Sequence, residues 1–149
     1  MNNEQLQVFV DGVMNYFETL SSTPAQVGTP FLIDDMNEYL EEYTGFIGIS
    51  GKYQGIVFFT SPKAILLHLL ASYNVKDVSS DNMLDLVGEI ANTISGNARR
   101  TLGDEFMLSV PVVMRGEHSK VKVTKTFEIY VIPIIWRQHR ANVIINLNI

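Results

Sequence analysis

The sequence SDNMLDLVGEIANTISGNARRTL, residues 80–102, decides much of the fold of this 149-residue chain. Apolar residues recur in it every three or four positions, which predicts one long α-helix that ends near Gly103. When this helix is projected at about 100° per residue, one side is apolar. The expected core face consists of Leu84, Val87, Ala91, Ile94, Ala98 and Leu102. Small residues along its edge, including Gly88 and Ser95, would let a second layer approach closely.

The opposite side of the predicted helix carries a polar stripe. Its members are Asp85, Glu89, Asn92, Gly96 and one or both of Arg99 and Arg100. Spacing by three and four residues stacks them along one solvent-facing ridge. An exposed glycine inside a helix costs about 1 kcal/mol relative to alanine. Two interpretations of Gly96 stay open: a bare turn that lets a partner approach Glu89 and Asn92, or a glycine that only relieves a contact inside the fold.

The segments on either side of this helix complete a mixed pattern of helices and strands. Upstream, residues 6–20 and 64–70 are predicted to be helical, and residues 45–50 and 55–60 are predicted to form a hairpin. Downstream, strand-like runs cover residues 107–115, 120–135 and 141–149. The order helix, Pro-containing strand, hairpin occurs twice. We therefore expect a single α+β domain over residues 1–149, with an internal pseudo-twofold repeat of α-β-β-β units at about 1–75 and 76–149.

The last two strand-like runs are apolar on both faces, and Pro133 within them is typical of an edge strand or a bulge. An uncovered apolar edge tends to pair with another chain. Burial under helices of the same chain and a homodimer interface are both compatible with this pattern.

Composition excludes several classes of function. The chain has 16 acidic and 11 basic residues, a formal charge of −5 and no cysteine. The negative charge repels a phosphate backbone, so we expect no nucleic-acid partner. Without cysteine there is no disulfide, thiol nucleophile or Cys-based zinc site, and three dispersed histidines predict no metal site. No segment approaches the roughly 20 apolar residues that span a bilayer, so we expect a cytoplasmic protein with no membrane partner.

Residues 89–98, EIANTISGNA, resemble the signature helix of the CheC/CheX/FliY family of chemotaxis phosphatases. That helix has a Glu-x-x-Asn pair, an acidic or Ser position four residues earlier, filled here by Asp85, and a continuation of small residues with Gly. The resemblance continues in residues 45–57 and 108–113. It implies a CheC/CheX-like fold with long helices packed on a mainly antiparallel sheet. The chain is more similar to CheX than to CheC because its first helix has no second Glu-x-x-Asn pair.

The resemblance also implies a function. Family members remove the phosphoryl group from the phospho-aspartate of a CheY-like response regulator. Glu89 and Asn92 would be the catalytic residues: Asn92 would orient the attacking water, and Glu89 would pair with a lysine of the regulator. Asp85, Gly96, Arg99 and Arg100 would be partner-binding residues. No cofactor is expected on this chain because the regulator would bring Mg²⁺, and similarity to CheX favours a homodimer joined through β-structure.

Two other interpretations belong to different classes. One is a non-catalytic adaptor that keeps the fold and binds a regulator or another signalling component. The other is a purely structural dimeric domain, which gives no reason for an exposed Gly96. The intact Glu89 and Asn92 pair favours the phosphatase, because an adaptor would not need both groups.

Overall fold

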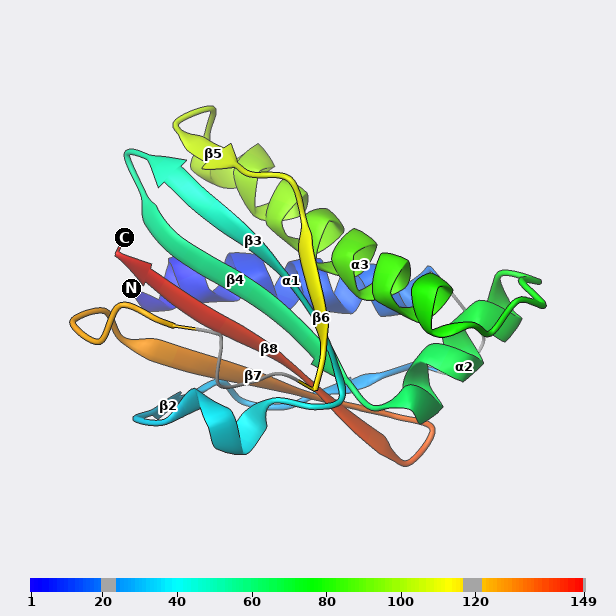
Figure 1. The fold of residues 1–149 in the computed structure, drawn as a ribbon. Coiled ribbons are helices and arrows are strands. Elements are labelled where there is room, and N and C mark those ends of the chain that lie inside the picture. The colour runs from blue at the N-terminus through cyan, green and yellow to red at the C-terminus, as the bar shows by residue number, and fades with distance from the viewer. Residues whose placement is uncertain (20–23, 117–121, 149) are drawn as a thin grey trace.

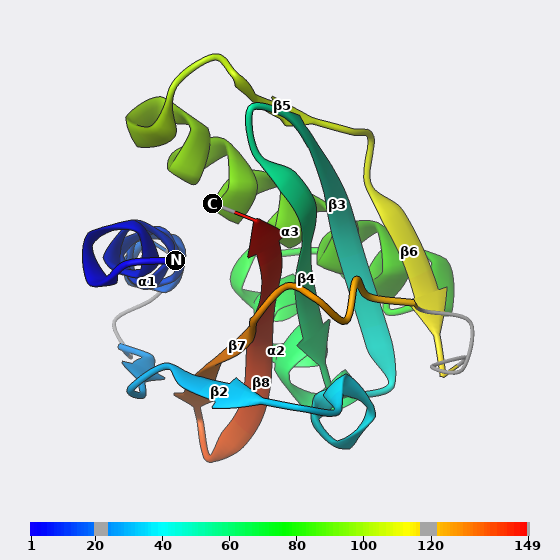
Figure 2. The same cartoon turned by 90° about the vertical axis from the view of Figure 1, so that its left-hand side faces the viewer.

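The computed structural model describes residues 1–19, 24–116 and 122–148. Within these residues, three α-helices cover one face of an eight-stranded antiparallel sheet (Figures 1 and 2). The elements in chain order are α1 (Asn3–Glu18), β1 (Gln26–Val27), β2 (Phe31–Ile33), η1 (Met36–Tyr39), β3 (Tyr43–Gly51), β4 (Gln54–Ser61), α2 (Lys63–Ser72), α3 (Ser80–Leu102), β5 (Phe106–Leu108), β6 (Val112–Arg115), β7 (Ile129–Trp136) and β8 (His139–Asn148). This confirms the predicted fold class. In the described residues, no helix is long and apolar enough to cross a membrane.

The sheet mixes strands from the two halves of the chain. Its order is β1-β7-β8-β4-β3-β5, with β2 also pairing β7 and β6 also pairing β3. The hairpin β3–β4 from the first half therefore lies beside the hairpin β7–β8 from the second half, and β4 pairs with β8 at the centre. This order is the one expected if two α-β-β-β units exchange their first strands, since β2 pairs with β7 and β6 pairs with β3. The internal duplication itself stays a prediction.

The helix α3 lies directly on β3, backbone against backbone. A Cβ atom added to Gly45 in β3 would overlap the carbonyl group of Val87 and lie 2.7 Å from the backbone nitrogen of Gly88. A Cβ atom on Gly88 would in turn lie 2.8 Å from Val113 Cγ1 in β6. The close approach that the small residues predict therefore occurs, and it sets the depth of α3 on the sheet.

The ends of α3 follow from local sequence. Ser79 is the N-cap, and its hydroxyl oxygen accepts a hydrogen bond of 3.3 Å from the backbone nitrogen of Asn82. Gly103 ends the helix with a φ of +98°, a conformation that glycine adopts without strain. The helix α1 begins at Asn3, before the predicted residue 6, because Asn2 and Gln5 form a reciprocal capping box.

The face of the sheet opposite the helices is covered by extended chain. In Figure 2 the orange segment before β7 crosses this face, and η1 lies beside it. The buried amide of Asn146 donates to the carbonyl oxygens of Thr124 and Phe127, at 3.2 and 3.3 Å, and Asn142 donates to the carbonyl oxygen of Tyr39 at 2.9 Å. These asparagines therefore attach both covering segments to the central strand β8.

Three details of the strand prediction were wrong. The run predicted over residues 107–115 is interrupted, because β5 ends at Leu108 and β6 begins at Val112. The described residues 122–128 are not part of a strand, although their sequence alternates, and β7 begins only at Ile129. Pro133 does not mark an edge strand, because β7 pairs with β8 on one side and with β1 and β2 on the other. It lies opposite the interruption between β1 and β2, where Gly28 donates to its carbonyl oxygen at 2.8 Å. A residue without an N–H fits at that interruption.

We expect Gly45→Ala to lower the free energy of unfolding by about 2 kcal/mol, because the added carbon overlaps a backbone that cannot easily move. Urea denaturation of the purified protein measures this change. Gly12→Ala is the matched control, since its Cβ would lie 3.4 Å from Asn97 Cβ and make ordinary contact. Equal stabilities for the two variants would contradict the close backbone contact between α3 and β3 at Gly45.

Candidate functional site

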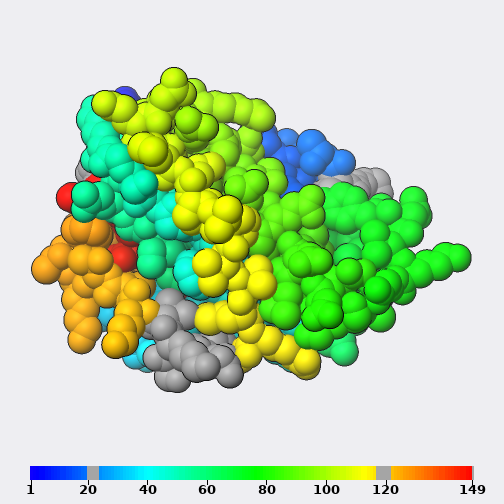
Figure 3. Space-filling model, turned by 45° about the horizontal axis from the view of Figure 1, so that its top comes forward, coloured from blue at the N-terminus to red at the C-terminus, as the bar shows by residue number. Residues whose placement is uncertain are grey.

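The residues predicted to form the site lie together on the outer side of α3. We call this row the α3 ridge: Asp85, Glu89, Asn92, Gly96, Arg99 and Arg100. All are exposed except Gly96, which is half-buried. The opposite face of α3 is buried from Met83 to Ala98, whereas Leu84 and Leu102, predicted as core, are only half-buried at its margins. The buried face packs α3 on the sheet, and the other face presents the ridge to solvent. In Figure 3 the green surface of this part of the chain is open on the face shown.

Gly96 interrupts the row of side chains on the ridge, and we call this gap without a side chain the bare step. Apart from its chain neighbours and the backbone of its own helix, no heavy atom of the described residues lies within 4 Å of the position where its Cβ would be. The glycine therefore relieves no contact between α3 and the rest of the described fold, which excludes the second of the two interpretations of Gly96. An alanine would fit there and would favour the helix, so the packing of the described residues gives no reason for a glycine at this position.

Asn92 and Glu89 present free polar groups one helical turn apart. In the part of the chain that the structure describes, neither side chain makes a hydrogen bond or an ion pair, and both are exposed. The hydroxyl of Thr93 donates to the carbonyl oxygen of Glu89 at 2.9 Å, so it uses the backbone and leaves the carboxylate free. An amide and a carboxylate in this arrangement can contact a partner without first breaking an internal bond.

Two tyrosines adjoin Glu89. The hydroxyl groups of Tyr16 in α1 and Tyr73, the residue after α2, are joined by a hydrogen bond of 2.8 Å. Burial raises the pKa of Tyr16 far above its usual value, and the bond to Tyr73 and the charge of Glu89 raise it further. Burial also raises the pKa of Tyr73. Both hydroxyls therefore stay neutral beside the carboxylate.

The charges of the ridge are divided along the helix. Asp85 and Glu89 occupy the first half, and Arg99 and Arg100 lie in the last turn. The Arg99 guanidinium lies 3.8 Å from the Asp104 carboxylate, an exposed pair of small energetic value. At about 1.5 Å per residue, Asp85 and Arg99 lie roughly 20 Å apart along the helix axis. A partner that spans the ridge would therefore meet negative charge at one end and positive charge at the other.

A pocket of about 280 Å³ adjoins the acidic end of the ridge. It is lined by Leu70, Tyr73, Val75, Asn82, Asp85, Leu86 and Glu89. Three of these residues come from the end of α2 and the turn after it, which projects from the molecule in Figure 1. The sequence did not predict this pocket. The available signal was the apolar residues Tyr73, Val75 and Val78 within a mostly polar linker.

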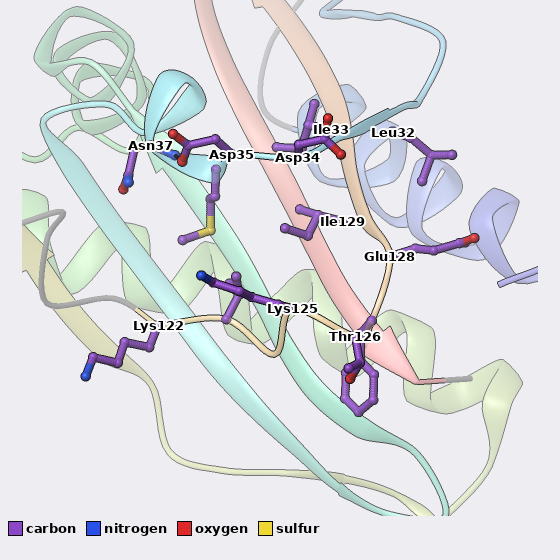
Figure 4. A pocket seen from close by; sticks show the side chains of 13 residues that line it. Leu32, Ile33, Asp34, Asp35, Asn37, Lys122, Lys125, Thr126, Glu128 and Ile129 are labelled. Carbon is purple, nitrogen blue, oxygen red and sulfur yellow. Dashed lines mark hydrogen bonds between the residues drawn. The ribbon is translucent and has the colours of Figure 1, made fainter.

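A larger cavity of about 920 Å³ lies on the opposite face of the sheet. In Figure 4, Asp34 and Asp35 project from the segment before η1, and Lys122 and Lys125 from the segment before β7. None of the ridge residues lines this cavity. Among residues 1–19, 24–116 and 122–148, no three His, Asp or Glu side chains are grouped as metal ligands.

Comparison with known proteins agrees with this geometry. Residues 43–135, well over half of the chain, match the family model described as chemotaxis phosphatase CheX. This chain belongs to the CheX family. No curated protein matches the sequence.

Solved structures share the fold of this CheX-family chain. A CheC-like superfamily protein from Shewanella sp. PV-4 is 23% identical, with a TM-score of 0.85 and coverage of 99% of both chains. CheX from Desulfovibrio desulfuricans is 22% identical, with a TM-score of 0.81 over 97% of this chain and 99% of that one. The CheX-CheY-BeF3-Mg²⁺ complex from Borrelia burgdorferi matches at 19% identity and a TM-score of 0.77, over 97% and 98% of the two chains.

We expect the stability of the protein to fall as the pH rises above about 10, with Tyr16 as one cause. The unfolded chain releases the Tyr16 proton near its usual pKa of 10.0, whereas the folded chain retains it. Unfolding then releases a proton, so high pH favours the unfolded state. Tyr16→Phe should reduce the slope of the unfolding free energy by up to about 1.4 kcal/mol per pH unit. Urea titrations between pH 9 and 11 measure it, and an unchanged slope would contradict the prediction.

Proposed function

We propose that this CheX-family chain dephosphorylates the phospho-aspartate of a CheY-like response regulator. The observation that supports this most directly is the α3 ridge. It exposes an amide, Asn92, and a carboxylate, Glu89, without hydrogen-bond or ion-pair partners in the described residues, beside the bare step at Gly96. The complex of CheX with CheY from Borrelia burgdorferi supports a regulator of this class as the partner.

Asn92 would orient the attacking water. Its side-chain oxygen accepts and its nitrogen donates, so one amide can hold a water in line with the scissile bond without ionising. The water oxygen attacks phosphorus as the bond from phosphorus to the aspartate oxygen breaks. The products are the free aspartate carboxylate and inorganic phosphate. The water supplies the hydroxyl that phosphorus gains, and its remaining proton ends on an oxygen of the released phosphate.

Glu89 would anchor the regulator. One turn before Asn92, its carboxylate can accept a charge-assisted hydrogen bond from a lysine of the partner and set the register of the helix. Gly96 would leave room for the regulator's backbone. Asp85, Arg99 and Arg100 would contact the rim of its active site, where they affect docking more than chemistry.

The metal would belong to the partner. Phosphoryl transfer needs a cation to neutralise the phosphoryl oxygens. The described part of this chain has no cluster of ligands to hold one, and Mg²⁺ is named in the Borrelia burgdorferi complex. In this proposal the regulator would hold the Mg²⁺, and this chain would bind no cofactor. A cytoplasmic location belongs to the same proposal, because the substrate would be an intracellular signalling protein.

Asn92→Ala should abolish stimulated phosphate release, by at least about 100-fold, because the water loses its orientation. Its stability should not fall, since the side chain is exposed and makes no hydrogen bond to the described residues. Phosphate release is measured with a panel of phosphorylated response regulators, and Asn15→Ala, an exposed amide on α1, is the matched control.

Wild-type activity in Asn92→Ala would refute the catalytic assignment. Tight binding of an activated regulator without hydrolysis by the wild type would instead identify a non-catalytic adaptor. Glu89→Ala separates anchoring from water orientation, because it should weaken binding as well as rate.

We also propose a homodimer joined through the β5–β6 edge of the sheet. The predicted surface was different: the two C-terminal runs, β7 and β8, lie inside the sheet and are largely buried by their own chain. A group of four exposed apolar residues lies on the other margin, at Met107, Val110, Val112 and Val113. Val110 is 79% exposed. An apolar sheet margin of this kind pairs readily with a second copy.

Val112→Lys should convert the dimer to a monomer, because it places a positive charge from each copy in the proposed interface between the two β5–β6 edges. Sedimentation velocity gives the mass directly. Leu32→Lys changes an exposed apolar residue of β2 by the same charge and should leave the mass unchanged. A monomeric wild type would exclude the dimer.

A further inference from the structure

The pocket beside Glu89 has an apolar floor and an acidic rim. Leu70 and Leu86 are buried at its base, and Tyr73 and Val75, which are 44% and 36% exposed, form a wall. Asp85 and Glu89 stand at the rim, and neither makes an ion pair with the described residues. Of the residues that the structure describes, no lysine or arginine lines the pocket. Its walls therefore favour a group that is apolar along its length and positive at its end.

The turn that forms the wall is held in place by hydrogen bonds. Tyr73 is tied to Tyr16 in α1 at 2.8 Å, and the backbone nitrogen of Val75 donates to the carbonyl oxygen of Leu70 at 2.9 Å. At the far end of the turn, the side-chain nitrogen of Asn82 donates to the carbonyl oxygen of Asp77 at 2.9 Å. A pocket braced from three elements is preformed, which lowers the entropic cost of filling it.

The size of the pocket limits what can enter. A volume of about 280 Å³ accommodates one long side chain with some water, and is too small for a helix or a strand. Lysine and arginine side chains match it, because their aliphatic stems pack on apolar surface while the charged ends stay near carboxylates and water. An anionic group would meet Asp85 and Glu89 and be repelled.

The pocket is continuous with the proposed catalytic residues. Asp85 and Glu89 belong both to its rim and to the α3 ridge, and Asn92 follows Glu89 by one turn. A regulator whose phosphoryl group lies over Asn92 therefore also covers the pocket.

We propose that this pocket is a docking subsite for a lysine or arginine side chain on the surface of the response regulator, beside its phosphorylation site. Asp85 pairs with the cationic end, and Tyr73 and Val75 pack against the stem. This side chain is a second basic contact, separate from the lysine that Glu89 anchors near the phosphoryl group. The inference rests on the proposed function for the identity of the partner.

The test uses Asp85→Asn and Val75→Ser, each with a matched control on the far side of the sheet. Asp34→Asn removes an equal charge, and Leu32→Ser truncates an apolar residue that is exposed to 57%, against 36% for Val75. Affinity for a beryllofluoride-activated CheY-like regulator is measured by titration calorimetry at several salt concentrations. Both pocket variants should weaken binding about tenfold, and both controls should match the wild type within about twofold. In the kinetic assay the loss should fall on KM more than on kcat.

Salt dependence identifies the occupant. Asp85→Asn should bind with a shallower dependence on ionic strength than the wild type, because one ion pair is lost, while Asp34→Asn keeps the wild-type slope. Wild-type affinity in both pocket variants would overturn the subsite. A loss in Val75→Ser with an unchanged salt slope in Asp85→Asn would overturn the cationic occupant. Because binding needs no turnover, these results stand apart from Asn92→Ala, whose full activity would refute the catalytic proposal alone.

Discussion

The contact of α3 with β3, backbone against backbone, is the constraint on which the rest of the molecule depends. With no side chain at Gly45, the helix lies on the strand at the level of Val87 and Gly88. Because packed interiors leave no room for adjustment, the rotation of the helix about its axis is set there as well. That rotation decides which residues of α3 are buried and which form the ridge. Glu89 and Asn92 thus owe their exposure to a glycine in another element.

A rigid support suits the proposed chemistry. Among the described residues the ridge offers no group of three metal-ligating side chains, and the role proposed for Glu89 and Asn92 is to position the partner and the water. Orientation is worth most when the groups that provide it do not move. Three features hold α3 in place: its capped ends, its buried face and its close contact with β3. The hydrogen bond between Tyr16 and Tyr73 holds the turn beside the ridge in place as well.

Periodicity in the sequence predicted the elements whose neighbours are close in the chain. The bounds of α3, the hairpin of β3 and β4, and the exposure of Asp85, Glu89 and Asn92 all follow from spacing within one element. The pocket could not be predicted this way, because Tyr73 and Glu89 meet only through the packing of α2 and α1 against α3. The alternation around Lys122 and Val123 was misleading for a physical reason. Val123 packs against a smaller cluster of buried apolar residues that includes Met36 and Phe58, and the segment lies across the sheet instead of pairing within it.

Gly96 has a practical consequence for anyone who modifies this protein. The Cβ of an alanine added there would meet open space and the alanine would strengthen the helix, so selection for heat resistance or soluble expression would favour losing the glycine. If the bare step serves a partner, such a selection would discard recognition while improving every property measured on the isolated chain. At Gly96, stability and soluble expression therefore favour one residue, whereas the proposed partner recognition favours another.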